Sequence, residues 1–265
     1  MPSTKKKRLT VVSTVPAVVH EALEEVSVLK IRIKFAKEGA MKFIGHLDMM
    51  RYFQKVMRRA NVDIRYSEGF SPHQIMSFAA PLGVGITSRG EYVDIEVLST
   101  DSSAKMLQQI NDAMTEGVEA LSYKKLPDSA EPAMAIVAAA DYTLSFREGY
   151  EPSNWDDFIT GLTTFIQKEQ ILIMKKTKKG EKETDIRPWI YQLEILPSHR
   201  IKMRVAAGSI ANLKPELVLQ AYFNNQNQEL AKFALLIHRD EVYANCSQGD
   251  TPHFCPLEQL GEDIE

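Results

Sequence analysis

The spacing of apolar residues changes abruptly between Leu29 and Ala60, and this change constrains the fold more than any other feature. From Leu29 to Phe35 apolar and basic or polar positions alternate, which is typical of a strand with one buried face. From His46 to Ala60 apolar residues recur at helical spacing and predict one stripe, made of Leu47, Met50, Phe53, Met57 and Ala60. The first folded unit is therefore expected to open with a strand and an amphipathic helix.

Further periodic segments extend this order along the chain. The first half also predicts strands at 62–66, 75–79, 90–98 and 118–124, with a helix at 102–114. The second half predicts strands at 141–146, 170–175, 185–196, 201–206 and 233–243, with helices at 155–168 and 215–222. Both halves thus approximate the order β-α-β-β-α-β, the first with an extra or broken strand.

We therefore predict an α+β fold of two tandem ferredoxin-like (β-α-β-β-α-β) units with antiparallel sheets. The proline-containing segment 126–132 is the expected linker, because it holds few apolar residues. The predicted organisation is an N-terminal extension (1–28), a first domain (29–125), a second domain (133–245) and a C-terminal tail (246–265).

Composition excludes several classes of protein. Of 265 residues 44% are hydrophobic and 25% charged, a balance that allows a buried core. Cys246 and Cys255 are the two cysteines, too few for a disulfide framework, so a reducing, cytoplasmic location is expected. No apolar run approaches the length that spans a bilayer, and acidic residues follow the basic start, which argues against a signal peptide. We expect no cofactor, no metal and no membrane contact.

Basic residues concentrate in one segment of a chain whose formal net charge is -3. Between Lys30 and His73 ten Lys or Arg residues stand against four acids, an excess of +6. Four of them, at helical spacing, would share the helix face opposite the apolar stripe: Arg51, Lys55, Arg58 and Arg59. Such a row can bind the phosphates of RNA. Taken alone, the row is better explained as a solvated helix face, since exposed helix faces are ordinarily charged, and basic residues near a helix C-terminus also complement the helix dipole.

The loop between Tyr66 and His73 holds the other candidates of the first half. Tyr66 and Phe70 could stack on unpaired bases, or could instead cover the core. His46 and His73 could act as general acid and base in RNA cleavage, but a structural or phosphate-binding role fits them better. Their spacing matches no tight metal motif, and Cys246, His253 and Cys255 lack a paired C-x-x-C.

A lysine-rich turn in the second half could also reach a phosphate, or could simply be a solubilising loop tip. Asn212 and Pro215 in the segment Gly208–Pro215 are explained by helix capping. The complete predicted nucleic-acid surface comprises Lys42, His46, Arg51, Lys55, Arg58, Arg59, Tyr66, Ser67, Phe70, His73, Lys176, Lys178, Lys179 and Arg187.

Three sequence blocks carry a family resemblance. The segment Phe43–Val97, with its GHLD, RRA and SEGFSPH motifs, resembles the radical-SAM-linked proteins, a bacterial family known as a domain of unknown function. TKKGEKETDIRP (Thr177–Pro188) and GSIANLKPELVL (Gly208–Leu219) resemble its later blocks. The first motifs are also distantly similar to ferredoxin-like repeat-processing ribonucleases of CRISPR systems.

The resemblance implies partners and a role. Members stand alone or are fused behind a cobalamin-binding radical-SAM enzyme, and standalone members resemble products encoded beside an RNase E/G-type ribonuclease. This chain lacks the three-cysteine cluster motif, so the resemblance implies an accessory part and not the radical enzyme. We expect an RNA-binding accessory protein that presents tRNA or rRNA to such a partner. The alternatives are a protein-interaction module that docks a radical-SAM partner, and a metal-independent ribonuclease using His46 or His73.

Overall fold

The computed structural model describes all residues except 1–27, 178–179, 248 and 250–252, so the predicted N-terminal extension lies almost entirely outside it. The helices are α1 (His46–Arg59), α2 (Ser103–Ala113), α3 (Ala133–Ile136), α4 (Trp155–Ile166) and α5 (Pro215–Asn225). Single 3-10 turns are η1 (Gly39–Phe43), η2 (Arg187–Trp189) and η3 (Leu257–Leu260).

The strands account for most of the predicted order. They are β1 (Leu29–Lys37), β2 (Met76–Phe78), β3 (Thr87–Val97), β4 (Val118–Lys125), β5 (Val137–Phe146), β6 (Leu172–Thr177), β7 (Gly180–Asp185), β8 (Ile190–Leu196), β9 (Arg200–Ala206), β10 (Leu235–Asn245) and β11 (Phe254–Pro256). The α+β prediction is confirmed. The single strand expected at 185–196 is wrong, because η2 turns the chain there and separates β7 from β8.

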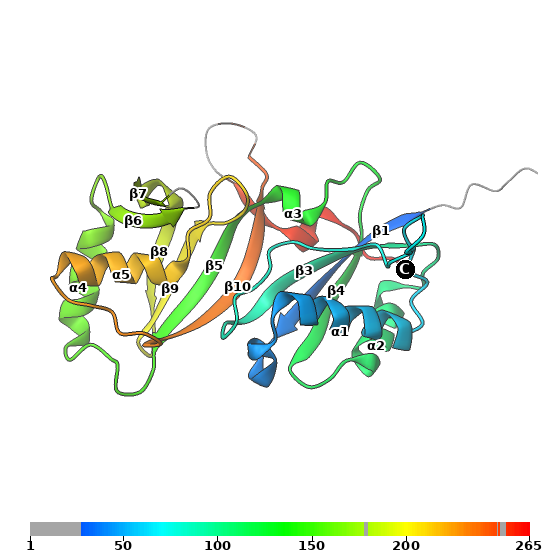
Figure 1. Cartoon of the computed structure of the whole chain (residues 1–265), viewed down its shortest axis with the longest axis horizontal. Coiled ribbons are helices and arrows are strands. Elements are labelled where there is room, and N and C mark those ends of the chain that lie inside the picture. Colours follow the sequence, from blue (N-terminus) through cyan, green and yellow to red (C-terminus); the bar gives the residue numbers. More distant parts are fainter. Residues whose placement is uncertain (1–27, 178–179, 248, 250–252) are drawn as a thin grey trace, which may run out of the picture.

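One large sheet replaces the two separate antiparallel sheets that were predicted. Its order is β4-β1-β3-β10-β5-β9-β8, with β2 beside β3 and β11 beside β10, while β6 and β7 form their own hairpin (Figure 1). Every pairing is antiparallel except that of β3 with β10, which is parallel. Short β2 covers only the later part of β3, so the start of β3 is free to pair with β10.

Gly90 allows this junction of β3 with β10 to close. A side-chain carbon at Gly90 would clash with the Cα of Glu241 and would lie 2.7 Å from the carbonyl oxygen of Asp240. Beside it, buried Ser88 donates through Oγ to the carbonyl of Arg239 (2.9 Å) and accepts from the amide of Gly90 (3.0 Å). The junction therefore requires a residue without a side chain at position 90.

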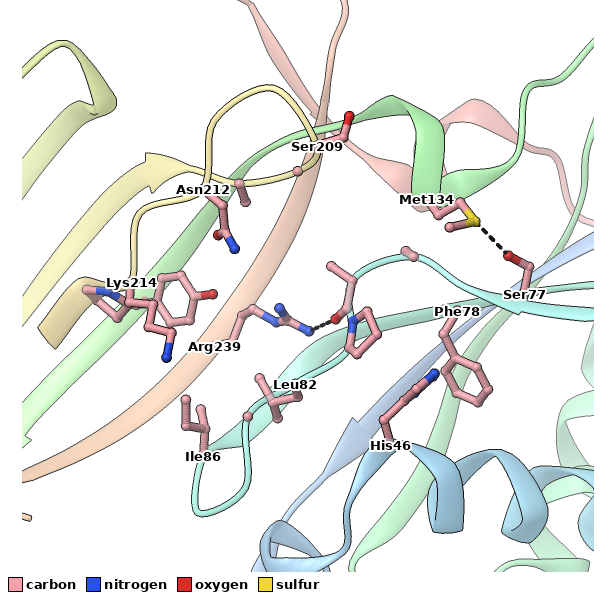
Figure 2. Close-up of a pocket in the computed structure, with 18 of the residues that line it drawn as sticks. His46, Ser77, Phe78, Leu82, Ile86, Met134, Ser209, Asn212, Lys214 and Arg239 are labelled. Atoms are coloured by element: carbon pink, nitrogen blue, oxygen red, sulfur yellow. Dashed lines mark hydrogen bonds between the residues drawn. The ribbon is translucent and has the colours of Figure 1, made fainter. Parts of the chain in front are cut away.

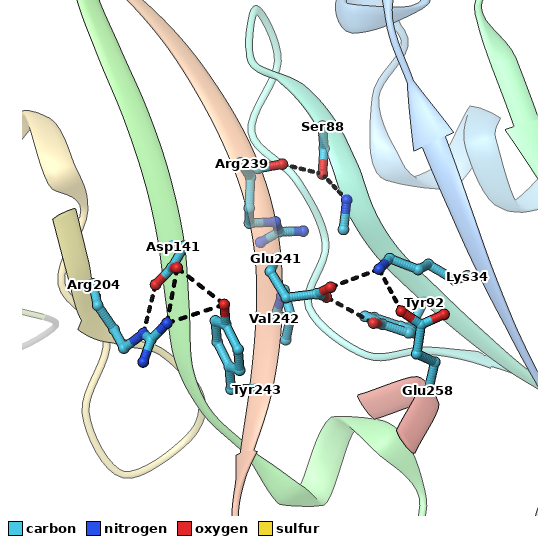
Figure 3. A network of polar contacts seen from close by, with 11 residues as sticks. Lys34, Ser88, Tyr92, Asp141, Arg204, Arg239, Glu241, Val242, Tyr243 and Glu258 are labelled. Carbon is cyan, nitrogen blue, oxygen red and sulfur yellow. Dashed lines mark hydrogen bonds and ion pairs between the residues drawn. The ribbon is translucent and has the colours of Figure 1, made fainter. Parts of the chain in front are cut away.

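A polar network centred on Glu241 of β10 also ties the two halves together (Figure 3). Lys34 of β1 donates to Glu241 (Nζ–Oε2 2.6 Å) and to Glu258 of η3 (Nζ–Oε1 2.7 Å). Tyr92 of β3 donates to the other Glu241 oxygen (2.7 Å). Burial by itself would lower the pKa of Lys34, but its bonds to the two carboxylates raise that pKa above the ordinary value of 10.5.

We expect Lys34→Met to lower the free energy of unfolding by about 2 kcal/mol, because it leaves two carboxylates together without their cation. Since the folded-state pKa is raised, the contribution of Lys34 is fully present below about pH 10.5 and is lost as the pH rises through the folded value. Urea unfolding of wild type and variant should therefore differ equally at pH 7 and 9, and less at pH 11. Lys105→Met, which removes an exposed pair with Asp101, is the control and should change little. A difference that does not shrink at pH 11 would contradict this assignment.

Two hydrophobic clusters lie on the sheet, one in each half. α1 and α2 pack against the β4-β1-β3 part, and α4 and α5 against the β5-β9-β8 part (Figure 1). On α1 the buried residues are Met49, Phe53, Val56 and Met57. The predicted stripe was thus partly wrong: Leu47 is 62% exposed, because the helix is rotated so that Met49 faces the core in its place. The domain boundaries at 29–125 and 133–245 stay a prediction.

The C-terminal segment is not a free tail. β11 pairs with β10, a bridge joins Glu262 to Lys125 of β4, and the amide of Ile264 donates to Ser103 Oγ of α2 (2.9 Å). A disulfide joins Cys246 to Cys255, and the expected cytoplasmic location stays a prediction. Among the described residues no helix is both long and apolar enough to cross a membrane.

Candidate functional site

Many of the basic residues in the segment 30–73 bond to carboxylates or carbonyls of the protein itself. Arg32 is buried and makes a two-bond ion pair with Asp94 (2.8 and 2.9 Å). Arg65 pairs with Glu96 (2.8 Å), and Lys34 with the two glutamates described above. Lys30 and Lys37 donate to backbone carbonyls. These cations are held by the protein's own carboxylates and carbonyls, so they stabilise the fold and are not available to a ligand.

Three basic residues of α1 stay free on the surface. Lys55, Arg58 and Arg59 are exposed, and their side chains make no hydrogen bond or ion pair with any residue that the structure describes. Arg51 is also exposed but pairs with Asp48 one turn earlier (3.0 Å, both about two-thirds exposed). An exposed pair of this kind is weak and can open for a ligand. The prediction that these four side chains point outward is confirmed.

The loop after Arg65 presents aromatic rings beside this helix. Phe70 is fully exposed, and Tyr66 is half exposed. His73 closes the loop, because Ser67 Oγ lies 2.8 Å from its Nδ1 and accepts from its amide at 3.1 Å. Ser67 and His73 therefore shape the loop. The alternative in which Phe70 covers the core is wrong.

This loop lies close to α1 through Gln74. The Gln74 amide donates to the Gln54 carbonyl and to the Tyr66 hydroxyl, both at 3.4 Å. On α1, Gln54 and Arg58 are one turn apart and share one side of the helix. We define the basic-aromatic surface as Lys55, Arg58, Arg59, Tyr66 and Phe70.

A cleft of about 510 Å³ lies between the two halves of the molecule (Figure 2). His46 and Phe78 stand on one side, with ring centroids 5.4 Å apart, and Asn212 and Lys214 stand across from them. Arg239 of β10 lies between the two walls. The walls come from α1, the segment 76–86, α3 and the segment 207–216, which are far apart in sequence.

Arg239 is a structural cation of this cleft. It binds both oxygens of Glu91 (Nε–Oε1 2.8 Å) and the carbonyl of Ala80, and all of these groups are largely buried. Burial by itself would lower the pKa of Arg239, but the charge of Glu91 raises it above its ordinary value, so the guanidinium stays protonated. Because Glu91 neutralises it, Arg239 adds little net charge to the cleft.

The structure does not bring His46 and His73 together. His46 begins α1 at the cleft, whereas His73 adjoins Gln74, which contacts Gln54 two turns further along the helix. Eight helical residues correspond to about 12 Å. The two imidazoles therefore cannot share one proton-transfer site in this conformation, and the two-histidine ribonuclease finds no support in the geometry.

The other predicted residues lie apart from the basic-aromatic surface. Lys42 of η1 sits over the Phe43 ring (5.2 Å). Arg187 of η2 donates to the Ile190 carbonyl (3.1 Å), so its charge helps to hold the local turn. Lys176 belongs to β6, and Lys178 and Lys179 lie outside the described residues. The hairpin of β6 and β7 stands at the opposite end of the molecule from α1 (Figure 1), so it lies apart from the basic-aromatic surface.

The sequence is similar to one family of known proteins. A family described as "Uncharacterized protein conserved in bacteria (DUF2344)" matches residues 30–215. The chain belongs to this family. The matched span contains α1, the loop with Phe70 and the Asn212 and Lys214 wall of the cleft, while Arg239 lies beyond it. No curated protein matches the sequence.

Among solved structures, 23 chains match. One belongs to the crystal structure of a Cbf5-Nop10-Gar1 complex, with a TM-score of 0.44 and 11% identity. The match covers 80% of this chain and 48% of that one, so this chain spans about half the length of the protein it matches.

Sequence reasoning missed most of the cleft. Local sequence places Lys214 only in a capping segment and gives no signal for Glu216 or Arg239. The glycines and prolines of the segment 81–85 and the GSIANLKP block were the available signals, because such loops often line sites. Their meeting depends on the pairing of β3 with β10, which no local pattern specifies.

Proposed function

We propose that this protein is an accessory RNA-binding protein. The supporting observation is that Lys55, Arg58 and Arg59 are exposed and have no partner among the described residues, while the Phe70 loop is held to α1 at Gln54, one turn from Arg58. Free cations bind phosphates, and an exposed ring offers a face on which an unpaired base can stack. Contact of the exposed Phe70 ring with water is also unfavourable, and a base stacked on the ring would reduce that contact.

A single-stranded segment suits this surface better than a duplex. Stacking on Phe70 requires a base whose face is open, and that is available in loops, bulges and ends of RNA. The three free cations can neutralise about three successive phosphates. The protein would then hold an RNA segment without chemistry of its own, consistent with a presenting role.

The finer assignments belong to the same proposal. The strand orders β4-β1-β3-β2 and β10-β5-β9-β8 support two ferredoxin-like units fused through β3 and β10. The sequence resemblance supports a cobalamin-dependent radical-SAM enzyme or an RNase E/G-type ribonuclease as the partner that receives the RNA. The same basic residues could instead dock an acidic partner protein, which is the competing proposal.

The proposal predicts salt-dependent binding of single-stranded RNA. With about three phosphate contacts, the slope of log affinity against log salt should be about -2. Fluorescence anisotropy with a labelled, unstructured RNA should therefore show affinity falling about 20-fold between 50 and 200 mM salt. A blunt-ended RNA duplex without unpaired bases is the control and should bind more weakly.

Absence of RNA binding at 50 mM salt, or binding that salt does not weaken, would contradict the proposal. Co-purification of a partner protein from nuclease-treated extract, combined with no RNA affinity, would favour the protein-docking alternative.

A further inference from the structure

The cleft and the basic-aromatic surface are joined along α1. His46, Met50, Gln54 and Arg58 recur every four residues and form one ridge of the helix. The segment from Gln74 to Phe78 runs beside this ridge, since Gln74 contacts Gln54 at one end and Phe78 contacts His46 at the other. Four extended residues span about 13 Å and eight helical residues about 12 Å, so the segment from Gln74 to Phe78 matches the length of the ridge from His46 to Gln54.

We propose that the cleft takes one unpaired nucleotide of the RNA bound along this ridge. The inference rests on the proposed RNA binding and deepens it, because it names where one base of the strand goes. A cleft of about 510 Å³ is within the range of small-molecule sites and can hold a nucleoside. Removing a base from its stack into a pocket is a common way for proteins to read it.

The polar groups of the cleft suit a nucleotide. Side chains of Asn212 and Lys214 face the space and make no hydrogen bond or ion pair with any described residue (Figure 2). One carboxylate oxygen of Glu216 is buried without a hydrogen-bond partner among the described residues, so it can accept from a base N–H. The ring nitrogens of His46 likewise have no partner there. These groups offer both donors and acceptors, as the edge of a base requires.

The apolar groups and the net charge of the cleft further limit which ligands it can bind. Phe78, Leu82 and Tyr142 line the cleft and can cover the faces of a base. Glu91 neutralises Arg239, and Glu216 offsets Lys214, so the cleft carries almost no net charge. A phosphodiester carries one negative charge and suits a nearly neutral cleft. A nucleoside triphosphate carries several negative charges and does not suit it. The geometry therefore favours a nucleotide within a strand.

Photocrosslinking can test this placement. A single-stranded RNA carrying one 4-thiouridine, moved position by position, is irradiated with the full-length protein, and crosslinked peptides are identified by mass spectrometry. We expect one position to crosslink to the peptide containing Phe78 or Tyr142, and positions further along to crosslink near Phe70.

The variant Asn212→Ala, Lys214→Gln should abolish the crosslink in the cleft, keep the crosslink near Phe70 and weaken RNA binding about tenfold. Lys232→Gln, an exposed lysine outside the cleft, is the matched control and should leave both crosslinks intact. Circular dichroism of both variants tests whether the fold is retained.

The outcomes separate the two proposals. Salt-dependent binding with crosslinks only near Phe70 overturns the cleft assignment and leaves RNA binding standing. Binding that the cleft variant does not weaken overturns it as well. Absence of any RNA binding overturns both.

Discussion

The triple variant Lys55→Gln, Arg58→Gln, Arg59→Gln is expected to lose about 100-fold in affinity for single-stranded RNA at 50 mM salt. These side chains have no hydrogen-bond or ion-pair partner among the described residues, so their removal should cost binding and leave the fold intact. Because three phosphate contacts disappear, the slope of log affinity against log salt should become less negative by about 2. Fluorescence anisotropy titrations at four salt concentrations measure both quantities.

The matched control removes the same charge elsewhere. Lys168→Gln, Arg200→Gln, Lys232→Gln changes three exposed cations of the second half and should reduce affinity by less than about threefold. If both triple variants lose affinity equally, the effect is one of net charge, and the basic-aromatic surface is not the RNA site. An unchanged salt slope in the first variant would lead to the same conclusion.

The second large effect is expected at the junction of the two halves. Gly90→Ala should lower the free energy of unfolding by about 4 kcal/mol, because its Cβ would meet backbone atoms of Asp240 and Glu241 that cannot move without breaking the β3–β10 pairing. For a chain of this size that loss corresponds to a fall of about 8–16 °C in Tm. Differential scanning calorimetry measures it directly.

Gly45→Ala is the control for this variant. Gly45 precedes α1 with an ordinary negative φ, and no atom lies within 4 Å of an added Cβ, so the change should cost less than about 1 kcal/mol. Equal stability of Gly90→Ala and the wild type would show that the two halves do not pair as described. Two separate unfolding transitions in the variant would instead indicate that only the junction has opened.

Local patterns in the sequence determined most of the secondary structure. Strict alternation predicted β1, and helical spacing predicted α1, because a half-buried element must place its apolar residues at its own period. Exposure of Lys55, Arg58, Arg59 and Phe70 agrees with the sites proposed from the sequence, since charged residues resist burial and the loop holds glycine and proline.

Register within an element was harder to predict than its presence. Leu47 belongs to the apolar spacing of α1 but is exposed, and Val56 is buried in the core. A helix can rotate slightly about its own axis at little cost in free energy. Its packing partners therefore decide which side faces the core. For the same reason the sequence could not show which basic residues of 30–73 would be paired. Arg32 meets Asp94, 62 positions away, and only the pairing of β1 with β3 brings them together.

The sequence by itself thus determined an α+β chain with a basic helix next to an aromatic loop. Tertiary structure alone decided that both halves share one sheet, that the C-terminal segment returns to α2 and β4, and that a cleft opens between His46 and Lys214. These features depend on contacts between residues far apart in the sequence, such as Ser103 and Ile264, which are 161 positions apart. Such contacts follow from the shapes that finished elements present to each other, and hydrophobic periodicity along the chain does not encode them.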